Sequence, residues 1–173
     1  MNVFIAGPRA LKTLHKSVKE RLSNILENNF TIFVGDANGI DKQIQQFCFD
    51  NNYKFVKVFA SNGKARNNIG EWEVENVIVS SKLKGFDFYA AKDLEMARAA
   101  DYGFMIWNGK SKGTLNNMVN LVKLNKKSLV YLTTTKKFYV INNNNDIEDL
   151  KKVIESGDID IISSDDSEQM KFF

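Results

Sequence analysis

Glycines, lysines and hydroxyl side chains gather in a short segment that joins an apolar run to an amphipathic stretch. The two glycines let a backbone come close to a ligand, and a helix that follows would direct free N–H groups and its positive dipole end at an anion. The segment therefore predicts a phosphate-binding loop, with an ordinary strand-to-helix turn as the alternative. It is not a Walker A sequence, because neither lysine directly precedes the threonine. The candidate contacts are Trp107, which could stack on a base or belong to the core, and Asn108, Gly109, Lys110, Ser111, Lys112, Gly113 and Thr114.

Two further glycine loops follow apolar runs, at residues 7–9 and 35–39. Because ligands of parallel α/β sheets bind beyond the carboxyl ends of the strands, we expect the three loops to converge at one edge. Two polar residues of the second loop, Asp36 and Asn38, could equally cap the next helix. An acid in the first helical turn, here Asp41, is also favoured by the helix dipole. The candidate contacts are Gly7, Pro8, Arg9, Gly35, Asp36, Asn38, Gly39 and Asp41.

A long loop at residues 60–70 is rich in hydrogen-bond donors. Its Arg66 is a candidate anion contact, because a guanidinium can bind phosphate or carboxylate with two hydrogen bonds, and Asn67 is a neighbouring donor. If the protein is an enzyme, its candidate catalytic carboxylates are Asp93, Glu95 and Asp36. The first two are two residues apart and should point to different faces of a helix, which weakens a paired acid–base interpretation.

The composition fits one α/β domain. A chain of 173 residues with 43% hydrophobic residues can build a full core. The net charge of +3 is small, so we expect no nucleic-acid partner. No apolar run is long enough for a membrane span or a signal-peptide core, and we expect a cytoplasmic protein. One cysteine and one histidine provide neither a disulfide nor a zinc site, and we expect no metal.

Apolar runs and amphipathic stretches alternate along the chain. They predict strands at 2–6, 31–34, 53–59, 101–107 and 128–132, with helices between most of them. This order indicates a three-layer α/β sandwich whose central sheet of about five strands is mainly parallel. We expect a single domain over 1–160, with a strand–helix extension at 136–160 and an acidic, loosely ordered tail at 161–173.

Residues 72–79 have a period near two, which predicts an extra strand or a hairpin arm, and we interpret residues 71–90 as an insertion or lid. A short alanine-rich helix is expected only afterwards, from Ala91 to Ala100. The aromatic residues Phe86, Phe88 and Tyr89 would pack this insertion onto the body, or would stack on a base.

Four short motifs in this order resemble the SLOG superfamily, and most closely its YspA-like branch. The motifs are Phe4-Ile-Ala-Gly7-Pro-Arg9, Gly35-Asp-Ala-Asn-Gly39-Ile-Asp41, Lys92-Asp93-x-x-Met96 before Ala100-Asp101, and Gly109-Lys-Ser-Lys-Gly113-Thr114. The resemblance covers about residues 2–132 and extends to the cytokinin-activating phosphoribohydrolases and the DprA family. It implies a Rossmann-like fold that binds nucleotides or NAD-derived ligands, with Lys92, Asp93 and Met96 among the site residues.

Two departures from the family pattern bear on chemistry. The phosphoribohydrolases have a catalytic glutamate three residues after the Gly-Thr threonine, whereas this chain has Asn117, which cannot act as a carboxylate. The branch also has Arg-Asn where this chain has Lys92-Asp93. The first departure favours holding a ligand over cleaving one, and the second leaves open whether the ligand is that of other members.

Three functions follow from these features. The favoured one is a module that senses or sequesters a small nucleotide or ADP-ribose-like ligand, with no other cofactor expected. The second is an N-glycosidase or ribosyltransferase acting on nucleoside phosphates. The third is a partner-binding protein of phage or mobile-element origin that uses the fold as a scaffold. A homodimer or a higher homo-oligomer is left open.

Overall fold

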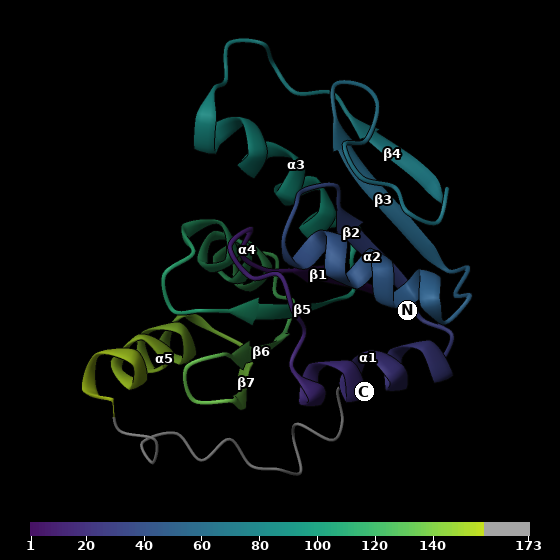
Figure 1. The fold of residues 1–173 in the computed structure, drawn as a ribbon. Coiled ribbons are helices and arrows are strands. Elements are labelled where there is room, and N and C mark those ends of the chain that lie inside the picture. Colours follow the sequence, from purple (N-terminus) through teal and green to yellow (C-terminus); the bar gives the residue numbers. More distant parts are fainter. Residues whose placement is uncertain (158–173) are drawn as a thin grey trace.

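The computed structural model describes residues 1–157 of the chain, which fold into a seven-stranded sheet with five helices (Figure 1). The predicted tail at 161–173 lies outside the described residues. The strands are β1 (Asn2–Ala6), β2 (Thr31–Gly35), β3 (Val56–Ser61), β4 (Glu73–Val77), β5 (Tyr102–Trp107), β6 (Ser128–Leu132) and β7 (Lys137–Ile141). The helices are α1 (Lys16–Glu27), α2 (Ile40–Asp50), α3 (Gly85–Ala99), α4 (Lys112–Lys123) and α5 (Asn144–Ser156).

The strand order is β4-β3-β2-β1-β5-β6-β7, and only β7 is antiparallel to its neighbour. β1 therefore lies between β2 and β5. After β1 the chain builds one half of the sheet, from β2 to β4, and then returns to the other side of β1 to build β5, β6 and β7. This reversal of direction is the place where α/β folds of this type bind ligands. The predicted α/β, Rossmann-like, mainly parallel sheet is confirmed, with seven strands where about five were expected.

Helices cover both faces of the sheet (Figure 1). On one face, apolar residues of α1 and α2, such as Leu22 and Ile44, pack against the inward side chains of the strands. On the other face, α3, α4 and α5 contribute residues such as Met96, Met118 and Leu150. The central strands β1, β2, β5 and β6 are buried on both sides, which explains why their sequences are continuous apolar runs without alternation.

Residues 71–90 differ from the predicted inserted hairpin. β4 is not a hairpin arm but the parallel edge strand of the main sheet, paired with β3. The segment after β4 is tied back by Asn62, whose side chain donates to the carbonyl oxygen of Val79 and accepts from its N–H, both at 2.7 Å. Helix α3 then begins at Gly85 and not at Ala91, with Asp87 in a first turn where an acid is favoured.

The early start of α3 has a consequence for the binding edge. The first turns of this helix extend past the carboxyl ends of the central strands, away from the sheet (Figure 1). Aromatic side chains that the sequence assigned to an insertion therefore stand on a regular helix beside the glycine loops. No helix within residues 1–157 has the length and apolar character to cross a membrane.

Candidate functional site

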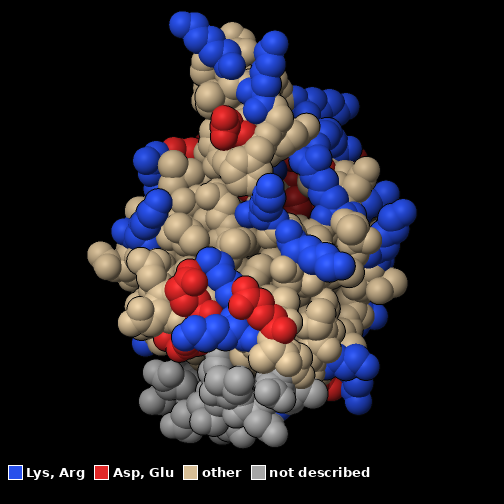
Figure 2. All heavy atoms as spheres, turned by 90° about the vertical axis from the view of Figure 1, so that its left-hand side faces the viewer, with Lys and Arg blue, Asp and Glu red and all other residues tan. Residues whose placement is uncertain are grey.

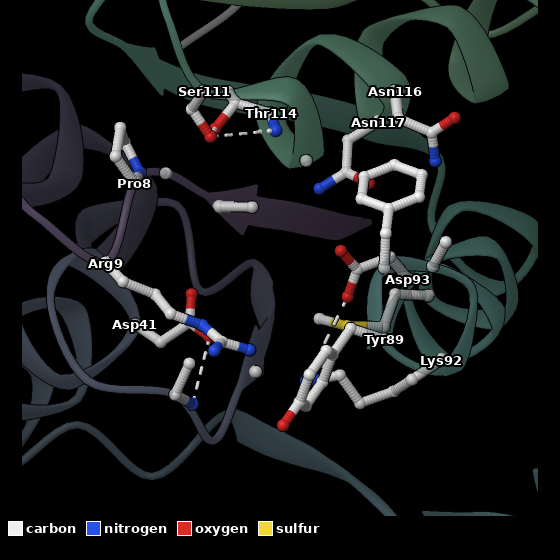
Figure 3. A pocket seen from close by; sticks show the side chains of 18 of the residues that line it. Pro8, Arg9, Asp41, Tyr89, Lys92, Asp93, Ser111, Thr114, Asn116 and Asn117 are labelled. Atoms are coloured by element: carbon white, nitrogen blue, oxygen red, sulfur yellow. Dashed lines mark hydrogen bonds and ion pairs between the residues drawn. The ribbon is translucent and has the colours of Figure 1, made fainter. Parts of the chain in front are cut away.

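A pocket of about 570 Å³ lies at the carboxyl edge of the sheet, between the loop after β1 and the helices α3 and α4 (Figure 3). Its size is in the range of small-ligand sites. Three loops that the sequence predicted to converge do meet here. The predicted contacts that line the pocket are Gly7, Pro8, Arg9, Gly35, Asp41, Lys92, Asp93, Met96, Asn108, Lys110, Ser111, Gly113 and Thr114.

Other predicted contacts lie elsewhere. Trp107 is only 2% exposed, and its indole N–H donates to the carbonyl oxygen of Ser111 at 3.0 Å, so it braces the loop from within the core. Glu95 faces a separate groove beside Phe59 and pairs with Arg98. The remaining predicted residues outside the pocket lining are Asp36, Asn38, Gly39, Arg66, Asn67, Gly109 and Lys112.

Several residues that line the pocket were not among the predicted contacts. The main ones are Phe86 and Tyr89 on α3, and Asn116 and Asn117 on α4. The aromatic pair had been interpreted as part of an insertion, although its stacking potential was noted. Asn117 had been considered only as the replacement for a catalytic glutamate. Its position three residues after Thr114, on the same face of α4, is the signal that could have placed it here.

The loop before α4 is held by its own side chains. The side-chain oxygen of Asn108 accepts from the N–H groups of Lys110 and Ser111, at 3.0 and 2.9 Å. Ser111 caps α4, and its hydroxyl oxygen accepts from the N–H of Thr114 at 3.3 Å. The first N–H groups of a helix have no acceptor within the helix. The cap takes the N–H of Thr114, so those of Lys112 and Gly113 are the ones available to an anion. A Cβ atom added at Gly113 would meet nothing within 4 Å, which shows that this turn faces open space.

An ion cluster lies beneath the pocket. Arg66 binds the Asp36 carboxylate with two side-chain hydrogen bonds of 2.7 and 3.0 Å, and the Lys92 ammonium lies 3.1 Å from the same carboxylate. Burial alone would raise the pKa of Asp36, but the hydrogen bonds from Arg66 and the charge of Lys92 hold it well below its usual range. Asp36 therefore joins the 60–70 loop to α3 and neither caps α2 nor lines the pocket.

Two further carboxyl groups face this cluster from the pocket side. Burial raises the pKa of Asp41 to about 7, against the opposing charge of Lys92. Its carboxylate accepts from the N–H of Ala37 at 3.2 Å. The packing leaves no room at Gly35, where a Cβ atom would lie 2.3 Å from the Asp41 carboxylate and 2.9 Å from the Lys92 ammonium. Burial likewise raises the pKa of Asp93, with Lys92, Asn117 and Arg9 opposing the shift.

Arg9 crosses the pocket toward α3 (Figure 3). Its guanidinium carbon lies 4.3 Å from the centre of the Tyr89 ring, and that of Arg66 lies 5.3 Å from the same ring. These are cation–π distances. Tyr89 is thus engaged by two cations, whereas Phe86, which is 49% exposed, is the aromatic side chain of the pocket free to stack on a ligand.

Basic side chains gather on the face toward which the parallel strands point. Lys and Arg predominate over the upper half of this face, whereas the acidic side chains lower down are mixed with basic ones (Figure 2). Two of the basic residues, Arg9 and Lys110, belong to the pocket lining. The small net charge of the chain therefore conceals a local excess of positive charge. Within residues 1–157 no cluster of three or more His, Cys, Asp or Glu side chains is arranged to hold a metal ion.

Comparison with known proteins gives one informative relationship. No protein-family model and no curated protein sequence matches the chain. Among solved structures, DNA processing protein A from Helicobacter pylori, described for its single-stranded DNA binding mode, matches with a TM-score of 0.58 at 14% identity. The match covers 91% of this chain and 73% of that one. At this identity the likeness concerns the fold, and it agrees with the predicted relation to the DprA family.

The comparison corrects the predicted partners. The sequence led us to expect a small nucleotide-like ligand and to discount nucleic acid, because the net charge is only +3. The fold is shared with a protein described for single-stranded DNA binding, which points toward nucleic acid as the class of partner and away from a small ligand. The net charge of the whole chain takes no account of the local excess of Lys and Arg on the face in Figure 2.

Proposed function

We propose that this chain binds single-stranded nucleic acid by holding one nucleotide unit of the strand in the pocket, with its phosphate at the N-terminus of α4. The observation that carries the proposal is the first turn of α4. It opens into the pocket beside open space at Gly113, and two basic side chains, Arg9 and Lys110, line the same pocket. The structural likeness to a single-stranded DNA-binding protein supports the choice of a strand over a free nucleotide.

Each part of the pocket has a separate task in this proposal. The free N–H groups at the start of α4 bind one phosphate group. Arg9 and Lys110 bind that phosphate or the next one along the strand, and the Phe86 ring stacks on the base. Binding of this kind tolerates many sequences, because every base has a face for stacking.

The finer family assignment belongs to the same proposal. Membership of the YspA-like branch of the SLOG superfamily rests on the four motifs in the sequence, and each of the four supplies residues of the pocket. We assign the chain a binding role and not a cleaving one, because Asn117 stands where the related hydrolases have a glutamate.

The test is a charge introduced at the phosphate position. Gly113→Asp places an acid in the first turn of α4, which suits the helix dipole and leaves the fold intact. It should weaken binding of a labelled oligothymidylate or oligouridylate by at least about tenfold in fluorescence anisotropy, because it opposes a charge-assisted hydrogen bond. The matched control is Asn144→Asp, which adds the same charge to the exposed first turn of α5 and should leave affinity unchanged.

Two results would count against the proposal. Equal affinity of wild type and Gly113→Asp would show that the strand does not use the start of α4. Displacement of the oligonucleotide by a mononucleotide at the same concentration of nucleotide units would show that the pocket takes a free nucleotide and not a strand. Circular dichroism of both variants verifies that the comparison is made between folded proteins.

A further inference from the structure

Asp93 is the one carboxylate of the pocket that the ion cluster leaves with free hydrogen-bonding capacity, among the described residues. Asp36 accepts three hydrogen bonds from Arg66 and one from Lys92, and Asp41 accepts from Ala37 in the packed space beside Gly35. The nearest ammonium to Asp93 is that of Lys92 at 4.0 Å, which is too far for a hydrogen bond. The Asp93 side chain is 24% exposed, against 5% for Asp36.

Asn117 stands beside Asp93 on the facing helix (Figure 3). It is 2% exposed and lines the pocket, and its side-chain oxygen has no hydrogen-bond partner within residues 1–157. Buried polar atoms without a partner are uncommon in folded proteins. The Asn117 side chain donates a hydrogen bond to the Asp93 carboxylate, which leaves the Asn117 oxygen and further lone pairs of that carboxylate as acceptors on the pocket wall.

The place of this pair along α4 indicates which part of a nucleotide it meets. Asn117 follows Thr114 by three residues, so it lies about 4.5 Å further along the helix and on the same face. A phosphate bound at the start of α4 therefore has its sugar near Asn117. A carboxylate repels a second phosphate but accepts a hydrogen bond from a hydroxyl group.

We propose that Asp93 and Asn117 bind the 2′-hydroxyl group of the nucleotide in the pocket, so that the site prefers ribonucleotide strands over deoxyribonucleotide strands. This inference rests on the proposed function. The 2′-hydroxyl is the group by which proteins distinguish RNA from DNA, and it is both a donor and an acceptor. It donates its one proton to the Asp93 carboxylate or to the free oxygen of Asn117, which lie side by side on the pocket wall.

The test compares three strands of equal length and base composition: oligouridylate, oligodeoxyuridylate and the 2′-O-methyl form of oligouridylate. The wild type should bind the ribose strand about tenfold more tightly than either of the others, since the hydrogen bond involves a charged acceptor. The methylated strand retains the sugar shape of RNA but lacks the donor. If this strand binds as tightly as the ribose strand, the inference is wrong, because the site would then recognise the shape of the sugar and not its hydroxyl group.

Substitutions at Asp93 and Asn117 test whether these two residues cause the preference for the ribose strand. Asp93→Ala should bring the ratio of ribose to deoxyribose affinity close to one. The ratio is the readout, because removal of a negative charge beside the phosphates changes the affinity for both strands. Asn117→Ala should lower the same ratio in part. Glu95→Ala is the matched control, because it removes a carboxylate from the same helix outside the pocket, and its ratio should equal that of the wild type.

The outcomes separate this inference from the function on which it rests. Equal binding of all three strands by the wild type overturns sugar recognition and leaves strand binding intact. Absence of binding to any strand removes both. Should Asp93→Ala unfold, Asp93→Asn keeps the shape of the side chain and removes its charge. An unchanged affinity ratio in Asp93→Asn and Asn117→Ala together would also overturn the assignment.

Discussion

The guanidinium carbon of Arg9 lies 4.3 Å from the ring centre of Tyr89, so a loop after the first strand touches a helix that is far along the chain. Replacement of Arg9 by alanine should weaken strand binding and reduce the slope of log affinity against log salt by about 0.7, the value for one phosphate contact on a single strand. Its effect on the free energy of unfolding should stay below about 1 kcal/mol, because a cation–π contact at an exposed site contributes little.

Salt titrations of binding check this prediction, with Lys12→Ala as the control. Lys12 is an exposed cation of the same loop that does not line the pocket. A similar fall in salt slope for both variants would show that Arg9 acts only through the general charge of the surface.

Stacking by Phe86 gives a second prediction. Phe86→Ala should reduce the binding free energy by about 1–3 kcal/mol, the contribution of one base stacked on an aromatic ring. Phe49→Ala is the control, because Phe49 on α2 is 50% exposed against 49% for Phe86 but lies outside the pocket. Anisotropy measurements with a single oligonucleotide are sufficient, and an equal loss in both variants would contradict the assignment.

The space around two glycines predicts different effects of a substitution by alanine on stability. Gly35→Ala should destabilise the protein by about 1–3 kcal/mol, because its Cβ atom would overlap with Asp41 and Lys92 in a space already filled. Gly113→Ala meets nothing within 4 Å and should be neutral, or stabilising by up to about 1 kcal/mol through helix propensity. Urea unfolding followed by circular dichroism distinguishes these responses, and equal stability of the two variants would contradict the packing described here.

Asp41 makes the stability of the protein depend on pH. Its pKa in the folded state is about 7, above the ordinary value of 3.8, so ionisation of this carboxyl opposes folding increasingly as the pH rises between these values. Asp41→Asn removes that opposition and retains an oxygen to accept from Ala37. The variant should therefore gain stability relative to the wild type as the pH rises, with the largest gain above about pH 7.

Urea unfolding of both proteins at about pH 4 and about pH 8 measures this change. Three other charged groups act on Asp41: Lys92 lowers its pKa, and Asp93 and Asp36 raise it. All three are present in both proteins, so they do not account for a difference between them. A stability difference that is constant across the pH range would show that Asp41 titrates normally.

The architecture could be predicted because its causes are local. Apolar runs followed by glycine loops mark strands that enter turns, and their alternation with amphipathic helices requires a parallel sheet. The number of strands was underestimated at β4, whose alternating residues indicate a strand but not its partner. Pairing with β3 depends on the tertiary fold, because the backbone groups of β4 find acceptors and donors only at the open edge of the sheet.

The site was only partly predictable for a similar reason. Residues placed at the carboxyl edge by their loops, such as Arg9 and Thr114, do line one pocket. Asp36 had two local interpretations, as a helix cap or as a ligand contact, and in the structure it binds Arg66 and Lys92, which lie 30 and 56 residues away. Phe86 was assigned to an insertion because the true start of α3 depends on the course of the chain after β4.

A single carboxylate, that of Asp36, holds together a loop and a helix that meet only in the folded protein. Replacing Lys92 alone would leave a buried anion with less compensation, and replacing Asp36 alone would leave a buried cation. Relatives of this chain can therefore lose the ion cluster only if Asp36, Arg66 and Lys92 are replaced together. In an alignment of relatives, positions 36, 66 and 92 should covary as a unit, while Asp93 and Asn117 vary with the ligand that each relative binds.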